Sequence, residues 1–67
     1  MLEIFIIADY NLGDDKQFFL EESTGHTKTP FAYSATRFET YSEAKEKIEK
    51  IITVGEVYQI EKIFVKA

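Results

Sequence analysis

The side chains that could support catalysis are few and scattered along this chain. His26 is the only histidine, there is no cysteine, and Ser34 and Ser42 have no evident histidine–carboxylate partnership. Nucleophilic catalysis needs a base next to the nucleophile, and acid–base catalysis needs titratable groups that converge on one point. We therefore expect no enzyme activity, no catalytic residue and no cofactor.

One acidic segment begins like a calcium-binding loop. From Asp9 to Asp15, oxygen-bearing side chains recur at alternate positions. The pattern then departs from that of a calcium loop, because Gly13 comes one position early and Leu20 stands where a bidentate glutamate is required. We interpret the segment as a turn in which Asp and Asn side chains satisfy backbone amides, and we expect no metal site.

The charge balance argues against nucleic acid as a partner. The formal net charge is −4 and the pI is near 4.8, whereas nucleic-acid-binding domains carry a basic patch. Lys16 is the one basic residue among the first 22, a region that contains six carboxylates. Such a surface either meets a basic protein surface or keeps the protein in solution.

Length and composition indicate one small domain that spans residues 1–67. Hydrophobic residues make up 45% of the chain, ten of the 67 residues are Phe or Tyr, and no disulfide can supplement the core. The apolar segment Met1 to Ala8 is too short to cross a membrane and lacks the basic flank of a signal peptide. We expect a cytoplasmic protein with no membrane partner.

The pattern of apolar residues and turn signals predicts a series of strands. Leu2 to Ala8 and Lys16 to Glu22 are expected to pair as an antiparallel hairpin. Ser23 to Pro30 is predicted to be a polar loop, and Phe31 to Arg37 a short third strand or an extended edge segment. Glu56 to Lys66 is predicted to be the last strand, and the sequence leaves open whether it lies beside the first.

A single helix is predicted between the third and the last strand. Thr40 and Glu43 form a T-x-x-E capping box, and Gly55 is expected to end the helix. Apolar residues recur at helical spacing at Ala44, Ile48, Ile51 and Ile52. The fold class predicted is α+β in the order β-β-(β)-α-β: an antiparallel sheet of three to four strands with one helix packed on one face.

The predicted strands carry apolar residues on both faces, although one helix can cover only one of them. In the first strand Ile4 and Ile6 oppose Phe5 and Ile7. We expect the second face to bind a protein partner, and the alternative is that loops or the edge segment fold over it. The residues predicted to bind the partner are Phe5, Phe19, Tyr33 and Tyr58, with Asp14 and Asp15 providing orientation.

Residues 35 to 65 resemble a pattern found in small phage and prophage accessory proteins. The run from Ala35 to Ala44 has the form A-x-x-F-x-T-x-x-E-A, which leads an extended segment into the Ile-bearing helix, and a strand follows. The resemblance implies a host-takeover or anti-defence factor that acts by binding. It carries over no catalytic residue, because the pattern defines none.

Two functions remain after these considerations. The first is a non-enzymatic protein-binding module that occludes a partner or associates with itself as a homo-oligomer. The second is a small-ligand protein that binds or sequesters a nucleotide-type molecule. In that case the loop from Ser23 to Thr29 would supply His26 and Lys28 as hydrogen-bond donors to a phosphate group.

Overall fold

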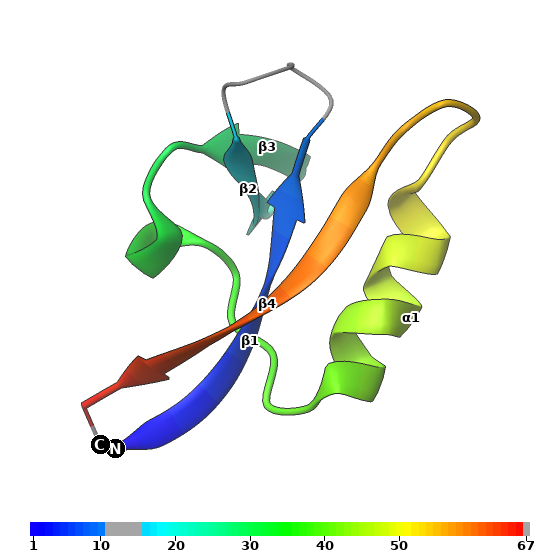
Figure 1. Ribbon diagram of the computed structural model, residues 1–67. Coiled ribbons are helices and arrows are strands. Elements are labelled where there is room, and N and C mark those ends of the chain that lie inside the picture. Colours follow the sequence, from blue (N-terminus) through cyan, green and yellow to red (C-terminus); the bar gives the residue numbers. More distant parts are fainter. Residues whose placement is uncertain (11–15, 67) are drawn as a thin grey trace.

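The chain folds as a four-stranded antiparallel sheet with an α-helix, so the predicted α+β class is confirmed (Figure 1). A computed structural model describes residues 1–10 and 16–66. The sheet order is β3-β2-β1-β4. The elements are β1 (Leu2–Asp9), β2 (Gln17–Glu22), β3 (Gly25–Thr29), the 3₁₀ helix η1 (Ala32–Ser34), α1 (Tyr41–Ile51) and β4 (Tyr58–Val65).

β1 is the central strand, and it pairs unevenly with its two neighbours. It pairs with β4 along its whole length, from Leu2↔Val65 to Asp9↔Tyr58, which places the last strand beside the first. It pairs with β2 only at Ala8 and Asp9, so the two strands diverge beyond that point. The β1–β4 ribbon therefore extends past the rest of the sheet, and both termini lie at its free end (Figure 1).

The helix covers the face formed by the odd-numbered residues of β1, which we call the helix face. Ala44 of α1 is fully buried there against Ile7, Phe19 and Phe38. The predicted N-cap is confirmed, because the Thr40 hydroxyl accepts the Glu43 N–H at 3.2 Å. The prediction for Gly55 is wrong: the helix ends at Ile51, and Gly55, with φ +87°, lies in the turn before β4.

The third strand lies outside the segment predicted to form it. Ser23 to Pro30, predicted to be a loop, contains β3, and Phe31 to Arg37, predicted to be a strand, contains η1. β3 joins the sheet through backbone pairing with β2, and only Thr29 of its five residues is buried. An exposed edge strand needs no apolar residues, so its sequence resembles that of a polar loop.

An extended segment fills the space where β1 and β2 diverge. The Thr36 N–H donates to the Phe19 carbonyl at 3.0 Å, and the Thr36 hydroxyl accepts the Glu21 N–H at 2.7 Å. Two residues later, Phe38 exchanges both backbone hydrogen bonds with Phe5, each at 2.9 Å. This segment carries the chain from η1 on one side of the sheet to α1 on the other (Figure 1).

The second sheet face, which we call the far face, is covered in part by the chain itself. Ile6, Ala8 and Phe18 form a buried cluster there with Ala35, and Ala32 packs against it. The alternative that an edge segment folds over this face therefore holds for this part of the sheet. Ala32 and Ala35 have small side chains, which allow the backbone of this segment to approach the strands closely.

Candidate functional site

The residues predicted to bind a partner do not form one surface. Phe5, Phe19 and Tyr58 all lie on the helix face, so their predicted position on the opposite face is wrong. Phe19 is only 2% exposed, because it packs against Ala44 and Phe38. Tyr33 is 64% exposed, but it belongs to η1 on the other side of the sheet. Asp14 and Asp15 lie outside the described residues.

An apolar surface does exist, along β4 and the adjacent flank of α1. With about 100° between successive helix residues, Tyr41 and Ile48 fall on one flank of α1 and Lys47 on the other. Ile52, the residue after the helix, adjoins Ile48 because its N–H donates to the Ile48 carbonyl. Lys47 forms an ion pair with Glu21 of β2 at 2.7 Å, so the opposite flank lies toward β4. We call the set the β4 surface; its exposed members are Tyr41, Ile52 and Phe64, and its half-buried members are Ile48 and Ile60.

The outer edge of β4 also presents backbone hydrogen-bonding groups. Because Phe5 uses its N–H and C=O to bond Phe38, its pairing with Lys62 is of the non-hydrogen-bonded kind. The N–H and C=O of Lys62 therefore point away from β1. The same alternation directs outward the backbone groups of Tyr58, Ile60, Lys62 and Phe64. Within residues 1–10 and 16–66, no strand pairs with this edge.

The two edges of the sheet differ in how they are protected. β3 is five residues long, it is exposed except at Thr29, and it carries His26 and Lys28. Short, charged edge strands resist pairing with other chains. β4 is eight residues long and carries Ile60, Ile63 and Phe64. β4 also carries Glu61 and Lys62, but a long edge strand with several apolar residues is a template for strand pairing, so the β4 edge is the stronger candidate for an interface.

A polar cluster lies on the helix face where β1 ends. Asp9, which is 2% exposed, forms an ion pair with Lys28 at 2.8 Å. Tyr58 lies opposite Asp9 in the ladder. Burial, followed by the charges of Glu56 and Asp9, raises the pKa of Tyr58 to about 12. The cluster holds β4 to β1 and β3, and we assign it a structural role.

The raised pKa of Tyr58 makes stability depend on pH in the alkaline range. The unfolded chain loses this proton near its ordinary pKa of 10.0, whereas the folded chain keeps it to about 12. The stability that this pKa shift contributes is therefore fully present below about pH 10, and it is lost as the pH rises through the folded pKa of Tyr58. We expect a loss of roughly 2 kcal/mol across that window, measured by urea unfolding. The same titration of Tyr58→Phe gives the background from other groups, and equal losses in both proteins would contradict the assignment.

On the far face, one carboxylate connects β4 to the chain that precedes β2. Glu61 accepts hydrogen bonds at 3.0 Å from both the Tyr10 hydroxyl and the Lys16 ammonium. The Lys16 ammonium also lies 5.8 Å from the Tyr10 ring centroid and 5.5 Å from that of Phe18. The hydrogen bond that the Lys16 ammonium donates to Glu61 is the main cause that raises the pKa of Lys16. Sequence reasoning missed this cluster because its members are far apart in the chain.

A pocket of about 500 Å³ opens beside the first half of β1. It is lined by Leu2, Glu3, Ile4, Arg37, Phe38 and Glu39. The residues predicted to donate to a phosphate lie elsewhere and are engaged differently. Lys28 pairs with Asp9, and the His26 ring lies 5.3 Å from that of Phe19. The pocket therefore does not include the residues predicted to donate hydrogen bonds to a phosphate.

These features define a small α+β domain with one protected and one open sheet edge. No family model, curated protein or solved structure matches the chain. Among the described residues, no group of three His, Asp or Glu side chains is placed to hold a metal ion. The same part of the chain has no helix long and apolar enough to cross a membrane.

Proposed function

We propose that this chain is a non-enzymatic protein-binding module that binds through the β4 surface. The observation that carries the proposal is the coincidence of exposed apolar side chains with an open strand edge. Phe64 is 53% exposed on β4, and Ile52 is exposed directly after the end of α1. Backbone groups along the edge can bind an extended partner segment, while the apolar side chains supply contact area.

This mode of binding suits a protein that acts by occlusion or self-association. Strand addition needs no catalytic group, and the partner is fixed by main-chain hydrogen bonds and by side chains at alternate positions. The resemblance of residues 35 to 65 to phage accessory proteins is in keeping with this role. In that pattern Phe38 and Ala44 pack the core, and the helix they position contributes Tyr41 and Ile52 to the β4 surface.

The proposal predicts that polar substitutions on the β4 surface abolish association and leave the fold intact. Phe64→Ser and Ile52→Ser should each weaken binding by about tenfold or more, because buried apolar anchors dominate interface energetics. Association is measured by light scattering for the protein itself and by capture on the immobilised protein for other partners. Circular dichroism reports the fold.

Phe31→Ser provides the matched control, because Phe31 is an exposed aromatic residue that precedes η1 and lies outside the β4 surface. It should bind like the original protein. Equal loss in Phe31→Ser and Phe64→Ser would show that association is not specific to the β4 surface. Full association in the Phe64→Ser/Ile52→Ser double variant would contradict the proposal outright.

The pocket beside β1 is the one observation that favours the second function, binding of a small ligand. Arg37 supplies one cation there, whereas Glu3 and Glu39 supply two carboxylates. This balance disfavours a nucleotide phosphate, so we place the ligand function second. A thermal-shift titration with ATP and GTP separates the two functions: a shift that grows with nucleotide concentration, and is lost in Arg37→Ala, would favour the ligand function.

A further inference from the structure

We infer that the β4 surface binds a second copy of this chain, in an antiparallel pairing centred on Glu61. This inference rests on the proposed function and names its partner. A two-fold dimer of this kind joins the two sheets edge to edge into one continuous sheet. Its exposed edges are then the two β3 strands, which are short and charged, and the two β4 edges are covered.

The outward backbone groups restrict how two β4 strands can pair. Only even-numbered residues of β4 point their N–H and C=O outward, so hydrogen-bonded pairs must join even residues with even residues. A pairing centred on Glu61 joins Tyr58 with Phe64 of the second copy and Ile60 with Lys62, and the reciprocal pairs follow by symmetry. Every outward-facing residue of both strands is then used.

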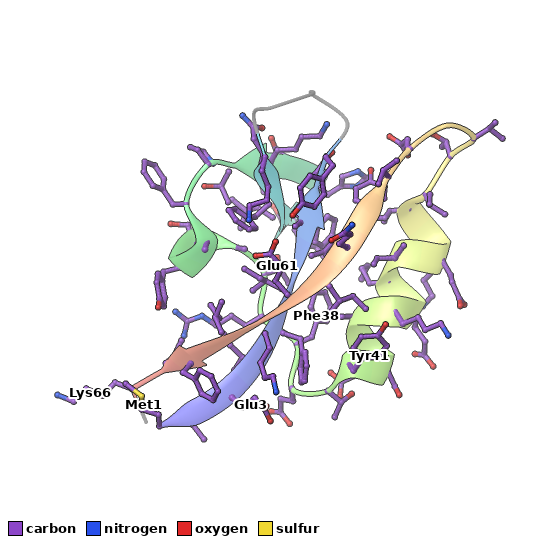
Figure 2. The ribbon with its side chains drawn as sticks, in the orientation of Figure 1. Met1, Glu3, Phe38, Tyr41, Glu61 and Lys66 are labelled. Carbon is purple, nitrogen blue, oxygen red and sulfur yellow. The ribbon has the colours of Figure 1, made fainter. Side chains whose placement is uncertain are left out.

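The side chains are complementary in the same register. Beyond the strand ends, Glu56 falls opposite Lys66 of the second copy, which pairs unlike charges at both ends of the interface. Val57 falls opposite Val65, and Tyr58 opposite Phe64, which pairs apolar and aromatic residues. The Glu56 carboxylate is held near the strand end because it accepts the Thr53 N–H at 2.8 Å. Lys66 directly follows the end of β4 (Figure 2).

The centre of the interface places two Glu61 side chains opposite each other. Like charges in such a pair are unfavourable unless cations offset them. Each Glu61 already binds Lys16 of its own copy at 3.0 Å, so the centre holds two carboxylates and two ammonium groups. Glu61 lies near the middle of β4, with three residues of the strand before it and four after it (Figure 2).

Other two-fold registers lose these matches. Centring on Lys62 places Lys66 opposite Tyr58 and Ile60 opposite Phe64, so no unlike charges meet across the interface. Centring on Ile60 places Phe64 opposite Glu56 and Tyr58 opposite Lys62, so no unlike charges meet across that interface either. In both registers, one outward-facing residue of each β4 has no residue of the second copy's β4 opposite it. The register centred on Glu61 is therefore favoured on hydrogen bonds and on charge.

The absence of cysteine permits a direct test of the register. In Glu61→Cys the two thiols lie in a non-hydrogen-bonded pair, whose Cα separation of about 4.5 Å suits a disulfide. In Ile63→Cys, on the same face of β4, the two thiols are displaced by about 13 Å along the strands. Under mild oxidation of the folded proteins we expect a covalent dimer from Glu61→Cys and none from Ile63→Cys.

A charge reversal tests the same register without cysteine. Lys66→Glu places two carboxylates opposite each other at each end of the interface. We therefore expect a weaker dimer, which dissociates at a protein concentration roughly tenfold higher than the original dimer does. Glu56→Lys combined with Lys66→Glu restores unlike charges and should recover the dimer. Light scattering over a dilution series measures both effects, and circular dichroism confirms the fold of each variant.

The outcomes are distinct for the inference and for the proposed function. Cross-linking of Ile63→Cys in preference to Glu61→Cys would overturn the register. A monomeric mass for the unmodified chain at every concentration would overturn the second copy as partner. The proposed function fails only if Phe64→Ser and Ile52→Ser leave all protein association unchanged. That comparison includes capture of other proteins, so it can succeed even if the unmodified protein is a monomer in solution.

Discussion

Replacing Phe19 with alanine should lower the free energy of unfolding by about 3–5 kcal/mol. Phe19 is 2% exposed and packs against Ile7, Phe38 and Ala44, which join β1, the segment after η1 and α1. A chain of 67 residues has a free energy of unfolding of roughly 3–10 kcal/mol. If the original protein lies near the lower end of that range, most Phe19→Ala molecules should be unfolded at room temperature. Urea unfolding followed by circular dichroism measures the change.

The sequence predicts Phe19 to bind a partner, whereas the structure places it in the core. The structure predicts that the helical signal falls together with association, because Ala44 loses the surface on which α1 packs. Phe31→Ala is the control, since Phe31 is 67% exposed and its truncation should change stability by less than about 0.5 kcal/mol. A Phe19→Ala protein as stable as Phe31→Ala would refute the assignment of Phe19 to the core.

The second large effect is expected at Lys28, where methionine keeps an unbranched apolar side chain and removes the ammonium group. Asp9 is 2% exposed, and its Oδ2 lies 2.8 Å from the Nζ of Lys28, so the substitution removes a cation from a buried carboxylate. Loss of one partner of a buried ion pair is strongly destabilising, because the remaining charge stays away from water. Lys28 is itself 34% exposed, so we expect a loss of about 2–3 kcal/mol in urea unfolding.

Lys47→Met is the matched comparison for Lys28→Met. It also removes a lysine from an ion pair, but Glu21 is exposed, and the Lys47–Glu21 pair is accessible to solvent. Exposed pairs contribute about 0–1 kcal/mol, so Lys47→Met should be nearly neutral. Equal losses from the two substitutions would indicate that burial of Asp9 does not control the cost.

Part of the fold follows from local patterns that need no tertiary information. The Thr40 cap, the Ile-bearing helix and the strands near Leu2 to Ala8, Lys16 to Glu22 and Glu56 to Lys66 were predictable, because capping and periodicity act over a few residues. β3 was not predictable in this way. Its five residues are held by backbone pairing with β2, and backbone pairing leaves little trace in side-chain type.

The candidate site shows the same division. The sequence indicated that apolar residues lie on both faces of the strands, and it correctly suggested more apolar surface than one helix covers. It could not assign the faces, because alternation along a strand separates odd from even residues without saying which set meets the helix. Phe19 is in the core because Phe38 and Ala44, which are distant in sequence, pack on its face of the sheet.

By itself, the sequence determined the fold class, the helix start at Thr40 and the presence of a second apolar face, since these depend on interactions between near neighbours in the chain. The tertiary structure alone decided which sheet edge is open, which aromatic residues are buried, and that Glu61 meets Tyr10 and Lys16. These features join residues that are distant in sequence. They are fixed by how the strands are ordered and how the chain passes between β1 and β2, which no local pattern encodes.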